Sequence, residues 1–117
     1  MKYMLLMYAD QSKEAQTPEE QEDIAPSVWY ALMEEMKAAG VLISNNGLSP
    51  VANATTVRIR EGKTLITDGP FAETHEQLGG FFLLECKDLD EALSWAEKIP
   101  HAKYGSVEVR PLWSETA

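Results

Sequence analysis

The sequence predicts an α+β fold, a ferredoxin-like sandwich with an inserted β-hairpin. Strand-like runs lie at both ends of the chain, two amphipathic helical segments lie between them, and an alternating hairpin separates the helices. In such a fold both helices pack on one face of an antiparallel sheet. The opposite face then needs another cover. We assign Leu5, Val57, Phe82 and Val109 to that face, and their apolar character predicts that a second subunit covers it.

The first part of the chain predicts a central strand and a broken helix. Residues 2–8 are apolar at nearly every position, which is typical of a strand covered on both faces. A helix is expected to begin after Thr17, a hydroxyl N-cap that is followed by proline and by the glutamate of a capping box. Pro26 interrupts this helix. Helical spacing of apolar residues then continues over 27–39 and ends at Gly40.

The middle of the chain predicts a short strand and a hairpin. Residues 41–43 are β-prone and precede a turn signal at 45–47. Residues 48–53 contain a proline and predict an irregular connection. The clearest hairpin spans 56–67, where alternating residues flank a turn at Glu61-Gly62.

The last part predicts a strand, a helix and a final strand. Residues 81–86 form an apolar strand, and a capping box at Asp88 begins a helix that ends before Pro100. Residues 101–105 are expected to form a loop, and 106–112 a half-exposed strand. The predicted core-facing residues of the helix are Leu89, Ala92, Leu93, Ala96 and Ile99.

Length and charge limit the classes of function. A chain of 117 residues fits one domain over 1–117 with a sizeable core. Ten basic and nineteen acidic residues give a formal charge of -9, which argues against nucleic-acid binding. The dense basic cluster on the hairpin is expected to be a solvated strand face. It consists of Arg58, Arg60 and Lys63.

The cysteine count and the amino terminus predict a cytoplasmic protein without membrane contact. One cysteine excludes an intramolecular disulfide and a thiolate metal cluster. Cys86 follows an apolar strand, so we expect a buried, unreactive thiol. The apolar run over 1–8 is too short for a signal sequence or a membrane span. Residues 113–117 are expected to form a frayed tail.

The stretch 68–80 combines loop chemistry with titratable side chains. Gly and Pro follow Asp68, so a strand must end there with its carboxylate exposed, although the same group can instead cap the turn through an Asx hydrogen bond. Residues 73–77 add two acids, a hydroxyl, an imidazole and an amide. Gly79 and Gly80 predict a bulge or a close backbone approach where the next strand begins.

This stretch, DGPFAETHEQLGG, closely resembles the signature of the DGPF family, whose members carry a YCII-related domain of the dimeric α/β-barrel superfamily. The resemblance implies a ferredoxin-like fold and a homodimer with sheets packed face to face. It also implies an association with extracytoplasmic-function sigma factors, because family members are often encoded beside them. The similarity continues in residues 1–6, 38–42, 89–93 and 104–111.

For the wider YCII group the resemblance implies a His and Asp pair in a cleft that performs acid/base chemistry on a small molecule. Asp68 matches that Asp. The chain departs from the pattern because no histidine occurs in the first helix or in the loop before it. His75 stands where DGPF proteins usually have Lys.

Two functions follow as hypotheses. In the first, the protein is a small-molecule enzyme in which Asp68 is a general acid or base and Glu73 or His75 assists. In the second, it is a non-catalytic, ligand-binding or regulatory homodimer. Neither requires a cofactor, and His75 and His101, 26 positions apart, have no recognisable metal-ligand spacing. The predicted pocket walls are Phe71, Pro70, Trp29 and Tyr8.

Overall fold

The computed structural model describes residues 1–13 and 17–113, which form two antiparallel sheets and a set of helices. The predicted loop residues 14–16 and the tail residues 114–117 lie outside the described residues. In chain order the elements are β1 (Lys2–Ala9), α1 (Pro18–Asp23), α2 (Pro26–Ala38), β2 (Leu42–Gly47), a 3-10 helix (Val51–Asn53), β3 (Thr55–Arg60), β4 (Lys63–Asp68), β5 (Gln77–Glu85), α3 (Leu89–Ala96), α4 (His101–Tyr104) and β6 (Ser106–Pro111).

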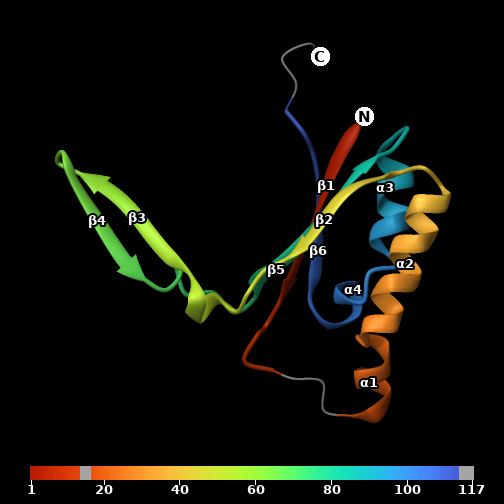
Figure 1. The fold of residues 1–117 in the computed structure, drawn as a ribbon, viewed down its shortest axis with the longest axis horizontal. Coiled ribbons are helices and arrows are strands. Elements are labelled where there is room, and N and C mark those ends of the chain that lie inside the picture. Colours follow the sequence, from red (N-terminus) through yellow and green to blue (C-terminus); the bar gives the residue numbers. More distant parts are fainter. Residues whose placement is uncertain (14–16, 114–117) are drawn as a thin grey trace.

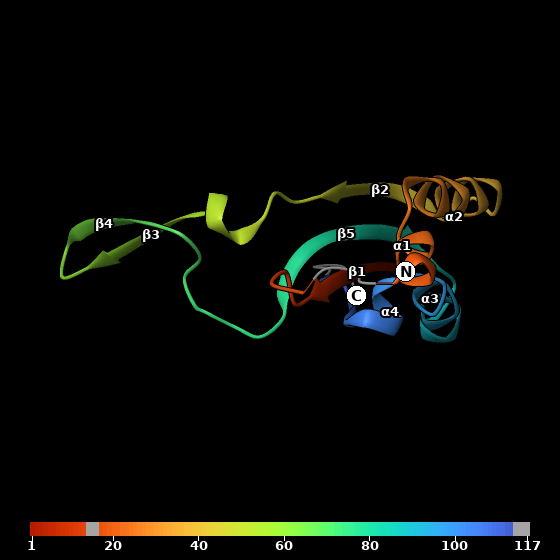
Figure 2. The ribbon, with the colours of Figure 1, turned by 90° about the horizontal axis from the view of Figure 1, so that it is seen from below.

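The main sheet has the strand order β2-β5-β1-β6, and all of its neighbouring strands are antiparallel. This is the ferredoxin-like order, with β3 and β4 inserted as a separate two-stranded sheet. Figures 1 and 2 show the helices on one side of the main sheet and the inserted hairpin on the other side. The predicted fold class is therefore confirmed. Among the described residues, no helix has the length and apolar character needed to cross a membrane.

The core lies between the main sheet and the helices. Alternate residues of β1 are buried against the helices, as the two-residue period of a strand requires. Leu32 and Met36 of α2 are buried, and Cys86 is 2% exposed, which confirms the expected burial of the thiol. The fully buried side chains with the largest volumes are Phe82, Leu5, Met36, Leu84, Ile99 and Cys86.

The residues on the uncovered face of the sheet differ from the prediction. Leu5 and Phe82 are paired and buried on the helix side, and Val109 pairs with Leu5 on the same side. Val57 belongs to the inserted hairpin instead. In strands that are apolar at nearly every position, alternation does not tell which set of residues faces the helices. The apolar stripe of the uncovered face consists of Met4, Leu6, Phe81 and Leu83, all half-buried.

Two strands are longer than predicted. Residues 45–47 read as a turn in the sequence, but they continue β2 and pair with residues 80–82 of β5. β5 begins at Gln77, four residues before the predicted start of this strand at 81, because its first residues pair with the end of β1. Long-range pairing has overridden local turn propensity in both places.

The region after α3 also differs from the prediction. Residues 101–104 form the short helix α4 where a loop was expected. Of the five predicted core residues of the preceding helix, Leu89 and Leu93 are exposed, at 48% and 42%. Ala92, Ala96 and Ile99 are buried as predicted. Because this face of α3 carries alanines, the helix can approach the sheet closely, and the larger leucines lie at its flanks.

The paired glycines confirm the predicted bulge and the predicted close approach. The register shifts between Met7 and Tyr8, which pair with Gly80 and Leu78, so Gly79 is the extra residue of a bulge. A Cβ added to Gly80 would lie 2.7 Å from the carbonyl oxygen of Asn46 on β2. This distance leaves no room for a side chain at position 80.

The inserted hairpin, residues 55–68, stands away from the rest of the chain, and we call it the arm (Figure 1). All of its residues are exposed except Thr56, so its basic cluster is solvated as predicted. The radius of gyration is 16.4 Å, compared with about 13 Å for a compact chain of this length. The arm accounts for this extended shape.

Candidate functional site

The turn after Asp68 is tied at the base of the arm. Gly69 has φ of 97°, a conformation that glycine adopts at little cost, and its N–H donates to the carbonyl of Ala54 at 2.6 Å. The Thr56 hydroxyl donates to the carbonyl of Gly69 at 2.8 Å, and Arg58 Nη2 donates to the carbonyl of Phe71 at 2.9 Å. Within the described residues, no hydrogen bond uses the Asp68 carboxylate. The turn is therefore held without the Asx cap.

The two faces of the arm have different chemistry. Thr55 pairs with Asp68 and Val57 pairs with Ile66, so the Asp68 side chain lies on an apolar face that also includes Ile59. We call this the apolar face of the arm. The opposite, basic face carries Thr56, Arg58, Arg60, Lys63, Leu65 and Thr67.

Glu73 and His75 lie in the exposed segment that leads from the arm to β5. This segment is tied to the loop after β1, because the backbone N–H of Gln11 donates to Gln77 Oε1 at 2.8 Å. Hydrogen bonds from Ser12 lower the pKa of Asp10, and the charge of the His75 imidazole contributes to the same shift. His75 thus lies near Asp10, and no described hydrogen bond or ion pair joins it to Asp68.

A polar cluster lies on the uncovered face, at the end of the sheet where Tyr8 pairs with Ser106. Glu108 accepts from Tyr8 Oη at 3.4 Å and from Arg110 Nη2 at 2.6 Å. Burial and the negative charge of Glu108 raise the pKa of Tyr8, and the hydrogen bond to Glu108 raises the pKa of Arg110. Ser106 Oγ donates to the Glu76 carboxylate at 3.1 Å. This cluster has proton donors, acceptors and a fixed positive charge.

Glu108 and Arg110 were not predicted from the sequence as functional residues. Their signal was the alternation of the last strand, where Ser106, Glu108 and Arg110 share one face. The partners that give this face its chemistry are Tyr8 of β1 and Glu76, the residue before β5, and both are far away in the chain.

A second group lies on the helix side of the sheet. The Trp29 ring stacks on Phe82 with 6.3 Å between centroids, and its centroid is 5.5 Å from that of His101. His101 Nδ1 is buried and has no hydrogen-bond partner in the described structure. Burial lowers the pKa of His101, because the surroundings disfavour the charged imidazole.

The predicted site residues therefore do not meet in one cleft within a single chain. Asp68, Pro70 and Phe71 lie at the base of the arm, and Phe71 is 75% exposed. Trp29 packs on the helix side of the sheet, whereas Tyr8 belongs to the uncovered face.

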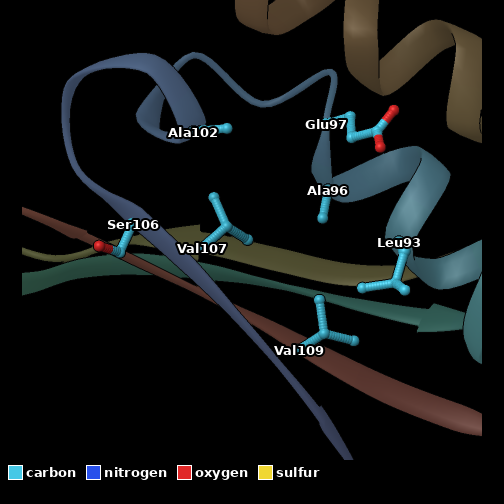
Figure 3. Close-up of a pocket in the computed structure, with 7 residues that line it drawn as sticks. All are labelled: Leu93, Ala96, Glu97, Ala102, Ser106, Val107 and Val109. Carbon is cyan, nitrogen blue, oxygen red and sulfur yellow. The ribbon is translucent and has the colours of Figure 1, made fainter.

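A shallow cavity of about 340 Å³ lies elsewhere, between α3, α4 and β6. In Figure 3 Val107 and Val109 form its floor, and the Glu97 carboxylate points away from the sheet. None of the predicted site residues lines it. Its lining residues are Leu93, Ala96, Glu97, Ala102, Ser106, Val107 and Val109. In the described part of the chain, no group of three or more His, Cys, Asp or Glu side chains is arranged to hold a metal ion.

Comparison with known proteins identifies the family. Residues 1–116 match the model of the YCII-related domain. The chain belongs to the YCII-related family. This YCII chain is 40% identical over 114 residues to the uncharacterised protein R00369 from Rhizobium meliloti (strain 1021), and the match covers 96% of this chain and 92% of the relative.

A solved structure is also similar to this YCII chain. It is 5-chloro-2-hydroxyhydroquinone dehydrochlorinase from Burkholderia phenoliruptrix AC1100, in complex with 2,5-dihydroxybenzoquinone. The sequence identity is 16% and the TM-score is 0.49, with 99% of this chain and 97% of the other chain covered.

Proposed function

We propose that this YCII-related protein is a homodimer that binds a small molecule and uses Asp68 as a general acid or base. The observation that carries the proposal is the state of the Asp68 carboxylate. It accepts none of the described hydrogen bonds, and it lies on the apolar face of the arm beside exposed β-branched residues. A carboxylate that the fold does not use is available for a ligand.

The homodimer is supported by the uncovered face of the main sheet. Its apolar stripe consists of Met4, Leu6, Phe81 and Leu83. The described helices all lie on the other side of the sheet (Figure 2). Apolar sheet faces of this kind need a cover, and a second copy of the chain offers the same stripe. Packing of the two sheets face to face removes both stripes from water. It also agrees with the dimer implied by the DGPF signature.

Acid/base chemistry is supported by the effect that a covering second subunit has on a carboxylate. Removal from water disfavours the charged form, which makes a carboxyl group a better proton carrier near neutral pH. Glu73 and His75 lie seven positions or fewer beyond Asp68 and are exposed, so they are available to exchange protons with solvent. Phe71 and Pro70 adjoin the carboxylate as apolar walls. Tyr8, on the uncovered face, is a further wall of this site, whereas Trp29 packs on the helix side, across the sheet from the arm.

A non-catalytic ligand-binding or regulatory dimer is favoured by one specific observation. No described hydrogen bond or ion pair links Asp68 to a second titratable group, and acid/base enzymes commonly orient their catalytic group in this way. In this function the motif forms a pocket that binds but does not transform its ligand. An association with a sigma factor is an extension of this second function.

The test is a thermal-shift screen of a metabolite library against wild type, Asp68→Asn and Asp90→Asn. Asp90 is an exposed acid in the first turn of α3, so Asp90→Asn controls for the loss of one surface charge. A ligand that binds the native state raises the midpoint of unfolding. We expect at least one compound to stabilise wild type and Asp90→Asn but not Asp68→Asn. Compounds that stabilise all three proteins equally would contradict a site at Asp68.

The two functions are separated by incubating each hit with the protein and following its mass. Conversion by wild type and Asp90→Asn, with conversion lost in Asp68→Asn, supports catalysis. Binding without conversion supports the non-catalytic dimer.

A further inference from the structure

We infer that the arm is an intermolecular element: in the homodimer, the arm of each chain packs its apolar face on the second copy, so each Asp68 site is closed by both chains. This inference rests on the proposed homodimer and goes beyond it. Packing of the two sheets face to face does not by itself require the arms to cross between chains.

The first observation is the exposure of the apolar face of the arm. Val57, Ile59 and Ile66 are 60%, 65% and 69% exposed. β3 and β4 pair only with each other among the described strands. An isolated two-stranded hairpin is marginally stable in water, and it needs a surface to pack against. The single chain does not offer that surface, because the arm stands on the side of the sheet opposite the helices (Figures 1 and 2).

The second observation is the size of the surface available for a dimer. Four strands about 4.8 Å apart and about 20 Å long have a flat footprint of about 400 Å². Stable interfaces bury about 800 Å² on each partner. One face of the two-stranded arm adds about 200 Å² from each chain by the same spacing. Each chain buries its sheet face, its own arm face and the surface that the partner's arm covers, which together come to about 800 Å², whereas the sheet face alone is about half of that.

The third observation is charge, which favours a second copy as the partner. The arm holds three of the ten basic residues and two of the nineteen acidic residues. Its net charge is therefore +1, and the net charge of the remaining chain is -10. The positive charges, Arg58, Arg60 and Lys63, lie on the basic face of the arm, opposite the apolar face that packs on the second copy, so they attract the acidic body of the partner across the arm and not by direct contact. A weakly basic arm and a strongly acidic body on the same chain are complementary between two copies.

The register of the sheet explains why the site would be shared. The arm leaves the main sheet beyond the Gly47 and Gly80 pair, at the end of the sheet that carries Tyr8. The base of the arm and Tyr8 therefore lie toward the same end of the sheet, with the arm at the β2 edge and the β6 residues of the polar cluster at the opposite edge. A second copy on the uncovered face covers this end and encloses Asp68 together with Tyr8, Glu108 and Arg110.

The first test compares two adjacent substitutions, Ile66→Asp and Thr67→Asp, by sedimentation at micromolar concentrations. Both residues are exposed in the single chain, but only Ile66 lies on the apolar face of the arm. We expect Ile66→Asp to raise the dimer dissociation constant at least tenfold more than Thr67→Asp does. Equal effects of the two substitutions would overturn the inference.

The second test uses the wild-type protein, so it does not depend on the folding of a variant. An equal mixture of ¹⁴N- and ¹⁵N-labelled protein is treated with a carbodiimide, which joins an amine to a neighbouring carboxylate. Lys63 adjoins the turn at the tip of the arm, so its long side chain can reach around the edge of the arm to the second copy. After the subunits have exchanged, we expect Lys63 to couple to acids of the body in peptides that contain one light and one heavy chain. A dimer in which Lys63 couples only within its own chain overturns the arm inference and leaves the proposed function standing. A monomeric wild type overturns the proposed homodimer.

Discussion

Gly80 lies where a neighbouring strand leaves no room for a side chain. An added Cβ would lie 2.7 Å from the Asn46 carbonyl oxygen and 3.1 Å from the Met7 side chain. At Gly79, the nearest atom to an added Cβ is 3.8 Å away, which is an ordinary contact. Two consecutive glycines of the same motif thus have different reasons to be glycine.

We expect Gly80→Ala to lower the free energy of unfolding by about 1–3 kcal/mol, because overpacking against backbone atoms forces the two strands apart. Gly79→Ala is the matched control, and it should lower the free energy of unfolding clearly less than Gly80→Ala does. Urea unfolding of both variants measures the difference. Equal stabilities would show that the approach of β2 to β5 at Gly80 is not close in solution.

His101 has a pKa lowered by burial, and this predicts a pH dependence of stability. Between the folded and the unfolded pKa, the unfolded chain binds a proton that the folded chain does not bind, so stability falls as the pH drops below about 6.5. The contribution is fully present above that pH. We expect the difference in unfolding free energy between wild type and His101→Asn to depend on pH in this window.

The measurement is urea unfolding of wild type and His101→Asn at a series of pH values from about 5 to 8. His75→Asn, which removes the exposed imidazole, controls for the loss of a histidine elsewhere in the chain. If the difference in unfolding free energy between wild type and His101→Asn stays constant across this pH range, the imidazole of His101 is solvated in the folded state.

At the scale of elements, side-chain caps set the starts of α1 and α3. Thr17 caps α1 in a complete capping box with Glu20, as predicted. Asp88 accepts a hydrogen bond from the backbone N–H of Glu91 at 2.9 Å, while the Glu91 side chain accepts from the N–H of Lys87. The N-cap of α3 therefore forms. The Glu91 side chain, however, accepts from the backbone N–H of the residue before the N-cap, whereas in a standard capping box it accepts from the N–H of the N-cap residue itself.

We expect Asp88→Ala to destabilise the protein by about 1 kcal/mol, because an N–H at the start of α3 loses its acceptor. Asp90→Ala, in the first turn of the same helix, removes a charge without removing a described hydrogen bond and should cost less. Denaturant unfolding compares the two variants. A larger loss for Asp90→Ala would mean that the helix dipole matters more than the cap.

These elements also show how far local sequence signals extend. The starts of α1 and α3, the hairpin and the break at Pro26 depend on neighbours within four residues, and each was predicted from those neighbours. The length of β2, the start of β5 and the helix at 101–104 were not predicted. Residues 45–47 have turn chemistry, yet they extend a strand because β5 supplies their hydrogen-bond partners.

At the scale of the whole molecule, the chain combines an acidic body with a projecting, weakly basic arm. Two copies with a charge of -9 repel each other, so the salt dependence of the dimer alone does not report on the arm. Two variants with the same net charge remove this difficulty. Lys63→Glu changes the arm, and Lys87→Glu changes an exposed position on the body.

We expect Lys63→Glu to weaken the dimer more than Lys87→Glu does at low ionic strength, and the gap should narrow at high salt as the local attraction is screened. Sedimentation equilibrium at two salt concentrations measures both dissociation constants. Identical constants at low salt would contradict an attraction between the arm and the second copy.

The sequence by itself determined the order and type of most elements, the burial of Cys86, the glycine bulge and the turn that ends the arm at Asp68. These features depend on alternation, caps and backbone preferences, which act over short stretches of chain. Only the tertiary structure decided which face of each strand is covered and which side chains meet. Tyr8, Glu108 and Arg110 form a cluster because the register joins β1 to β6, and Trp29 meets His101 because α2 packs beside α4. The Tyr8–Glu108 and Trp29–His101 contacts join residues more than 70 positions apart, and no local pattern encodes them.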